Sequence, residues 1–186
     1  LQAAKQGHAR AQYNLAVMYD SGEGVYEDDA EAINWFLKVA DKFEDAQFKL
    51  GRLYSKGEGV SQNNVEAVKW YRKAADQGHA ASQYYLGNFY DKGKGVPEND
   101  GEAIRWWRAA AKQGFVEAQV VLGASFAEGD GTPKSTVKAY MWWSLAQALG
   151  HKNMESKLSA IKEQMNSTEI GWAQRLAKEW WKRHNE

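Results

Sequence analysis

The sequence predicts an all-α fold in which helical repeats stack on one another. An anchor leucine and an anchor tryptophan each recur in steps of 35, 36 and 36 residues. They are Leu15, Leu50, Leu86 and Leu122, and Trp35, Trp70, Trp106 and Trp142. A pair of glycines lies between the leucine and the tryptophan of each unit. A unit of this length cannot bury its own apolar face, so the period indicates a stacked array, and such arrays are mostly binding scaffolds.

The second half of each unit has the pattern of an amphipathic helix. In the first unit the residues at i, i+3, i+4, i+7 and i+8 are Ala32, Trp35, Phe36, Val39 and Ala40. This spacing places all five on one stripe of a helix. The equivalent stripe recurs three more times, with glutamine in the last position of the fourth unit.

A capping signal precedes this second helix. In three units an Asp or Asn stands three residues before a glutamate, as Asp28 with Glu31, Asn63 with Glu66 and Asn99 with Glu102. This spacing favours a capping box, in which the glutamate reaches back to the cap. The fourth unit has Ser135 followed by Lys138, so we expect only half of the box there.

The first half of each unit predicts another helix, with Ala11, Leu15 and Tyr19 at i, i+4 and i+8 in the first unit. The residue after the anchor leucine is Ala16, Gly51, Gly87 or Gly123. Because glycine costs about 1 kcal/mol inside a helix, its repeated use predicts close approach of a neighbouring helix. The later glycine pairs are expected to form left-handed caps and turns, not phosphate loops, because they follow a helix.

Composition excludes several classes of function. With 24 basic and 24 acidic residues and a pI near 7.1, the chain lacks the basic surface that nucleic acid requires. The absence of cysteine excludes disulfides, thiolate metal sites and cysteine nucleophiles. His8 and His79 occupy the same place in units two apart, too far to share a metal. We therefore expect no catalytic residues, no metal and no cofactor.

Two segments carry a family resemblance. AQFKLGRLYSKGEGV, starting at Ala46, and EAIRWWRAAAKQGFV, starting at Glu102, resemble the two helices of Sel1-like repeats. The resemblance covers about residues 1–148, and the tail resembles the closing helices of bacterial Sel1 arrays. It implies a right-handed α/α solenoid related to tetratricopeptide repeats, a bacterial source, and helices closing the array at its C-terminal end.

The expected organisation follows from aligning the units. Residues 1–8 are the end of a second helix from a truncated preceding repeat, with Leu1 aligned to Leu37. Repeats span 9–43, 44–79, 80–115 and 116–148, and capping helices span 149–186. We expect further repeats and a signal sequence upstream, and a periplasmic or secreted protein, with a cytoplasmic place left open. We also expect a monomer, because a polar C-terminal cap disfavours stacking.

The resemblance also implies that the first helices line a concave face, and that a partner protein or peptide binds there without membrane insertion. The candidate contact residues vary in type between repeats while the framework stays the same. They are Asn14, Val17, Lys49, Arg52, Tyr85, Asn88 and Val121. Arg52 and Tyr85 are the expected anchors, since Arg and Tyr are enriched among binding hot spots.

Two other functions stay open. Trp107 and Trp143 each follow an anchor tryptophan, and the pairs could fill the core or form an aromatic platform for glycan or peptidoglycan. Some cysteine-rich relatives were linked to β-lactam binding or hydrolysis, which implies a hydrolase. The absence of cysteine weakens that implication.

Overall fold

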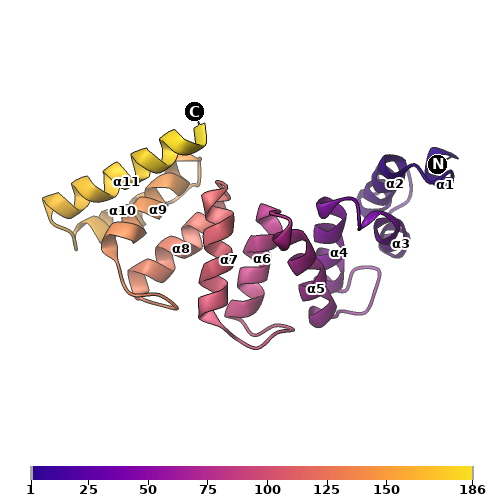
Figure 1. Ribbon diagram of the computed structural model, residues 1–186, viewed down its shortest axis with the longest axis horizontal. Coiled ribbons are helices and arrows are strands. Elements are labelled where there is room, and N and C mark those ends of the chain that lie inside the picture. The colour runs from indigo at the N-terminus through magenta and orange to yellow at the C-terminus, as the bar shows by residue number, and fades with distance from the viewer. Residues whose placement is uncertain (1, 186) are drawn as a thin grey trace. The chain divides into compact units, whose positions relative to one another are not determined.

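The computed structural model describes residues 2–185 (Figure 1). All regular secondary structure in this range is α-helical, which confirms the predicted all-α fold. The chain forms two compact units, one ending at Pro97 and the other beginning at Glu98. Leu1, for which the alignment predicted a helix, lies outside the described residues.

The first unit contains six helices among its described residues. They are α1 (Gln2–Lys5), α2 (Ala9–Ser21), α3 (Asp29–Val39), α4 (Glu44–Lys56), α5 (Asn64–Asp76) and α6 (Ala80–Asp91). Here α2, α4 and α6 are first helices of repeats, and α3 and α5 are second helices. Consecutive helices pack against each other around a core that includes Phe36, Val39, Leu50 and Leu53. This layering of helix pairs is that of an α/α solenoid.

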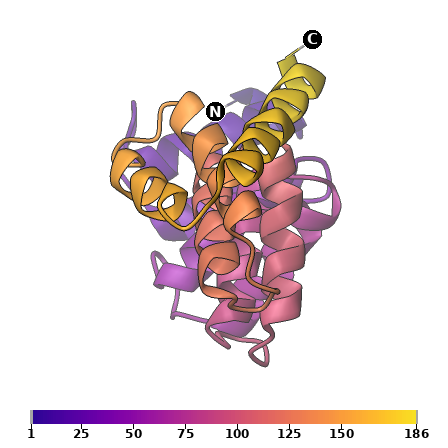
Figure 2. The same ribbon diagram turned by 90° about the vertical axis from the view of Figure 1, so that its left-hand side faces the viewer.

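The second unit begins with the second helix of the third repeat and ends with the predicted closing helices. Its described helices are α7 (Asp100–Lys112), α8 (Val116–Glu128), α9 (Thr136–Ala148), α10 (Glu155–Lys162) and α11 (Ser167–Asn185). Both α10 and α11 pack on α9 (Figure 2). The apolar side chains of Met154, Leu158, Ile161 and Met165, which have the spacing of one helical stripe, are buried.

Of the predicted capping boxes, the half in which the cap side chain accepts from the backbone is confirmed. The side chains of Asp28, Asn63 and Asn99 accept hydrogen bonds from the backbone N–H three residues on, at 2.9–3.0 Å, and Ser135 does so at 3.3 Å. The glutamates do not bond back to these caps. They accept from donors one turn further along, as Glu102 does from Arg105 at 2.8 Å, because a cationic donor three residues away competes for the carboxylate. A reciprocal box forms instead between Asn166 and Glu169 at the start of α11.

Each glycine pair adopts positive φ angles, which confirms the predicted left-handed caps and turns. The second glycine has a further role, because its backbone presses on the start of the preceding second helix. A Cβ on Gly59 would overlap the backbone of Asp29, and one on Gly95 would overlap the carbonyl of Asn64. A Cβ on Gly131 would lie 2.7 Å from the Cβ of Asp100. We call this contact the loop joint.

A glutamine forms a second joint between repeats. The amide Nε2 of Gln83 donates to the carbonyl of Ala75 at 3.1 Å, and that of Gln119 donates to Ala111 at 3.2 Å. Gln12 and Gln47 make the same bond to Ala4 and Ala40. These carbonyls lie at helix ends, where those of Ala4, Ala75 and Ala111 also accept from a glycine N–H of the turn, so the glutamine adds a second bond from the next repeat. This role was not predicted, although glutamine recurs at this position of the first helix in all four repeats.

Candidate partner-binding surface

The first helices of the first unit contact one another through side chains. Asp20 of α2 bonds to Lys49 and Arg52 of α4, and Phe48 of α4 contacts Tyr85 of α6. Six of the seven predicted contact residues belong to these three helices, and Val121 belongs to α8 of the second unit. We call the surface formed by α2, α4 and α6 the A-helix face.

A buried carboxylate organises the basic side chains of this face. The side chain of Asp20 is only 4% exposed, and its Oδ2 lies 2.7 Å from Nζ of Lys49. Its Oδ1 accepts from Arg52, whose other amino nitrogen lies 3.4 Å from Glu58. Lys49 and Arg52 remain partly exposed, so one carboxylate holds two cations in place at the surface. Asp20 was not among the predicted contact residues. Its equivalents in the other repeats are Ser55, Asp91 and Ala127, so no recurring residue type marks the position.

An aromatic cluster holds Tyr85 in the same face. The ring of Tyr85 is stacked on that of Tyr71, with centroids 5.5 Å apart and planes 10° apart, and it lies 5.7 Å from Phe48. Tyr85 is 39% exposed, whereas Tyr71 is buried. Burial raises the pKa of Tyr71 to about 12, while the Ser55 hydroxyl beside its phenol lowers it slightly. The cluster therefore presents one aromatic edge on a rigid support.

The remaining predicted contact residues differ in exposure. Asn14 is exposed on α2, while Asn88 of α6 and Val121 of α8 are half-buried. Val17 is also half-buried and packs against the core of the first unit. Position alone could not separate these cases, because a neighbouring helix covers part of each first helix.

The paired tryptophans do not form a surface platform. Trp107 and Trp143 are each 6% exposed, and their neighbours Trp106 and Trp142 are also buried. The indole Nε1 of Trp143 donates to the carbonyl of Val120 at 3.1 Å. The ring of Trp143 occupies the space that a side chain at Gly123 would need. The glycan platform is therefore wrong for these pairs, because all four indoles are buried, that of Trp143 in the space beside Gly123.

The histidine at the repeat boundary has structural partners. His79 caps α6, since its Nδ1 accepts from the backbone N–H of Ser82 at 3.1 Å. Its Nε2 lies 3.2 Å from a carboxylate oxygen of Asp45. Residues 2–185 contain no group of three or more His, Asp or Glu side chains placed to hold a metal ion. None of the helices described is long and apolar enough to cross a membrane.

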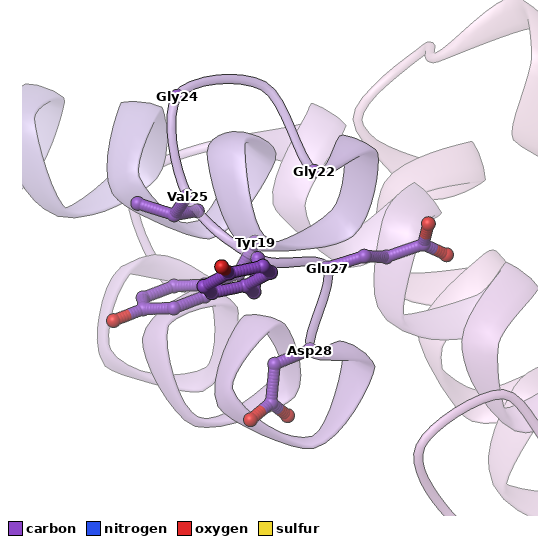
Figure 3. A pocket seen from close by; sticks show the side chains of 7 residues that line it. Tyr19, Gly22, Gly24, Val25, Glu27 and Asp28 are labelled. Atoms are coloured by element: carbon purple, nitrogen blue, oxygen red, sulfur yellow. The ribbon is translucent and has the colours of Figure 1, made fainter.

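Two surface hollows lie outside the A-helix face. One is formed by the loop of the first repeat, where the Glu27 side chain points away from the Tyr19 ring and Gly24 stands on the outer bend (Figure 3). The other lies between the start of α9 and α11, and we call it the α9 hollow. Its lining residues are Lys134, Ser135, Thr136, Val137, Lys138, Glu169, Trp172 and Leu176.

Comparison with known proteins agrees with this architecture. Residues 9–42, 44–79, 80–115 and 116–151 match the family described as Sel1 repeat. A Sel1 repeat protein from Oxalobacter formigenes is 31% identical, with a TM-score of 0.78 over 95% of this chain and 73% of that chain. A protective antigen present in uropathogenic Escherichia coli strains, displaying an SLR fold, is 27% identical, with a TM-score of 0.65.

That second match covers 98% of this chain, which spans about half of the antigen, 47% of its length. An immunity protein from Pseudomonas aeruginosa, 19% identical with a TM-score of 0.54 over 98% of this chain and 70% of that chain, shares the fold. A search of curated proteins finds no significant match. Because repeats of one family cover most of its length, the chain belongs to the Sel1 repeat family.

Proposed function

We propose that this chain is a non-catalytic scaffold that binds a partner protein or peptide through the A-helix face. The observation that carries the proposal is the stacking of exposed Tyr85 on buried Tyr71. A side chain already held by its neighbours loses little conformational freedom when a partner covers it. Tyrosine is also among the residues that contribute most to binding energy.

The ionic cluster supports a proposal for the chemistry of the partner. Asp20 neutralises one of the two cations that it holds, and Glu58, which lies 3.4 Å from Arg52, also pairs with Lys56 at 3.1 Å. The side chains of Lys49 and Arg52 keep part of their surface exposed, although Nε of Arg52 is buried. We propose that the partner presents an acidic side chain to these cations and an apolar or aromatic side chain to Tyr85. Complementary charge of this kind favours specificity and fast association.

Arg52 has a smaller role in this proposal than the sequence suggested. Its guanidinium already bonds to Asp20, so replacing it with glutamate would place two carboxylates together and destabilise the first unit. Tyr85 is therefore the cleaner probe of binding. Asn14, Val17 and Asn88 are proposed as surrounding contacts that exclude water from the anchor, and Val121 is proposed as a contact within the second unit.

We also propose that the protein works in the bacterial envelope or outside the cell. The similarity to a protein described as a protective antigen of uropathogenic Escherichia coli strains supports this location. The hypothesis of a β-lactam hydrolase gains no support from the described residues, because His79 serves to cap α6.

A library of displayed random peptides would test the proposal, with selection on the wild-type protein and counter-screening on variants. We expect enriched peptides with an acidic residue near an apolar or aromatic one, and binding lost in Tyr85→Ala. Tyr26→Ser is the matched control, because Tyr26 is an exposed tyrosine outside the face and Ser61 is its equivalent in the second repeat.

Thermal unfolding of both variants would show whether the fold is retained. Peptides that bind Tyr85→Ala as well as the wild type, or that are lost with Tyr26→Ser alone, would contradict the proposed face. Hydrolysis of a reporter β-lactam by the folded protein would contradict the proposal of a non-catalytic scaffold.

A further inference from the structure

The start of α9 lacks the loop joint that covers the start of the other second helices. In each of the first three repeats a loop glycine of the next repeat packs there, as Gly131 does on α7. One period after Gly131 the chain has Ser167, where α11 begins. The tail therefore replaces the loop joint with a helix, and α11 and the start of α9 border a hollow of about 540 Å³.

Apolar side chains supply part of the lining of the α9 hollow. Val137 of α9 is buried in a small core, and Leu176 of α11 packs against that core. Trp172 lies one helical turn before Leu176, on the same face of α11, and is 54% exposed. An exposed indole beside aliphatic side chains suits an apolar group of a ligand.

Two lysines give the hollow a positive charge. Lys134 and Lys138 line it and are exposed, and within residues 2–185 neither lysine is paired with a carboxylate. Nζ of Lys138 lies 5.0 Å from the centre of the Phe126 ring. Between Asp130 and Glu155 the sequence contains three lysines and no acidic residue, so the charge around the start of α9 is not balanced locally.

Lys138 occupies a position at which the other second helices carry an acidic side chain. Its equivalents in the first three repeats are Glu31, Glu66 and Glu102. A negative charge in the first turn of a helix interacts favourably with the helix dipole, so a lysine at this position is unfavourable for the helix. Residues that break a local rule of this kind are expected where a function requires them.

We propose that the α9 hollow binds an acidic segment of a partner protein. An apolar or aromatic side chain of the segment packs against Trp172 and Leu176, and flanking carboxylates pair with Lys134 and Lys138. The complementary charge selects the partner and speeds association, while burial of the indole contributes binding energy. The hollow belongs to the second unit and shares no residue with the A-helix face, so it is a separate binding site.

A protein segment fits this lining better than an anionic sugar does. Sugar hydroxyls need directional hydrogen-bonding groups, and two of those in the hollow are already engaged. Oγ of Ser135 accepts from the backbone N–H of Lys138, and the carboxylate of Glu169 accepts from that of Asn166 at 2.9 Å. The apolar lining suits an apolar side chain instead.

Selection from a library of displayed random peptides tests the proposal on the full chain carrying Tyr85→Ala. This parent variant lacks the anchor of the A-helix face, so failure of one site is not mistaken for failure of the other. We expect enriched peptides in which aspartate or glutamate flanks an apolar or aromatic residue. The affinity of such a peptide, measured by fluorescence anisotropy, should fall as salt is raised.

Charge reversal at the hollow identifies the contact. Adding Lys134→Glu and Lys138→Glu to the parent should weaken binding of a selected peptide about tenfold or more, and should favour the same peptide with lysine at each acidic position. Lys162→Glu with Lys178→Glu changes net charge equally at exposed sites outside the hollow, and binding should match that of the parent. Trp172→Ala should weaken binding by a similar factor while thermal unfolding changes little.

Thermal unfolding of Lys138→Glu separates binding from packing. This change restores the acidic residue of the other repeats, so its Tm should equal or exceed that of the parent although binding is weaker. A lower Tm with unchanged binding would assign the lysine to packing on Phe126 and overturn the proposal. Enrichment of no acidic peptide, or equal binding to the charge-reversed variant, would do the same. A tetrasaccharide of galacturonic acid that binds the parent in place of any peptide, and is lost in the same variants, would assign the hollow to a glycan instead.

Discussion

The ring of Tyr71 lies against the backbone of Gly51, so closely that a Cβ on Gly51 would stand 2.6 Å from Cδ1 of the ring. Gly123 and Trp143 repeat this relationship in the second unit. In the first repeat the corresponding residues are Ala16 and Phe36, both fully buried. The glycine inside the first helix thus leaves space for an aromatic ring of the second helix in the same repeat.

Gly51→Ala should therefore destabilise the first unit although alanine is the better helix former. Alanine recovers about 1 kcal/mol of helix propensity, but overpacking a core costs about 1 to 3 kcal/mol. Gly171→Ala is a matched control, because among the described atoms a Cβ there meets nothing within 4 Å. Urea unfolding should show Gly51→Ala less stable than the wild type and Gly171→Ala at least as stable. Equal gains in both variants would show that the ring moves aside freely.

The loop joint predicts unequal effects at equivalent glycines. Gly24→Ala should cost about 1 to 2 kcal/mol, the cost of placing alanine in a left-handed conformation. Gly95→Ala carries the same cost and in addition forces the carbonyl of Asn64 away, so we expect about 3 kcal/mol or more. Chemical denaturation of the two variants side by side measures the difference. A difference near zero would mean that the loop joint rearranges around the new Cβ without loss of stability.

Replacing a joint glutamine should also destabilise the chain. Gln119→Leu removes the hydrogen bond that the carbonyl of Ala111 accepts from the next helix, while the N–H of Gly114 still bonds to that carbonyl, so we expect a cost of about 0.5 to 1.5 kcal/mol. Gln174→Leu, on the exposed side of α11, changes composition in the same way and should have little effect. The free energies of unfolding of the two variants are to be compared. A neutral Gln119→Leu would show that its apolar contacts outweigh the lost bond.

Stability should decrease in alkali through Tyr71. Its folded pKa is about 12, above the ordinary value of 10.0, because burial favours the neutral phenol. The stabilisation is therefore complete below pH about 10 and is lost as pH rises through about 12, by up to roughly 3 kcal/mol. Unfolding measured between pH about 8 and 12 should show this loss, and Tyr71→Phe should reduce it. An equally steep loss in Tyr71→Phe would assign the effect to other tyrosines.

Most of the fold could be predicted from the sequence because the repeat period, the apolar stripes and the glycine pairs act locally and recur. A local signal of the same kind stands at the start of α11, where Asn166 supplies an Asx cap and Glu169 the reciprocal acid. The forward bonds of Glu66 and Glu102 were not predicted. Each glutamate can accept either from the backbone of the cap residue or from the basic side chain three residues later, and only side-chain geometry decides between the two bonds.

The candidate site was predictable only in outline. Position on the first helix identified Tyr85, Lys49 and Arg52, but the residues that hold them come from elsewhere. Asp20 belongs to the preceding repeat and Tyr71 to a second helix. Contacts between helices distant in sequence have no local signal, so neither the ion cluster nor the stacked rings could be inferred from spacing.

The two joints have a consequence for how such a chain evolves. The second helices α3, α5 and α7 are each held at the start by a loop glycine and at the end by the glutamine of the next repeat, both in the same register. Deleting or duplicating one whole unit therefore rebuilds identical joints at the seam. Length can then change by duplication without any compensating substitution, while side chains on the A-helix face diversify independently.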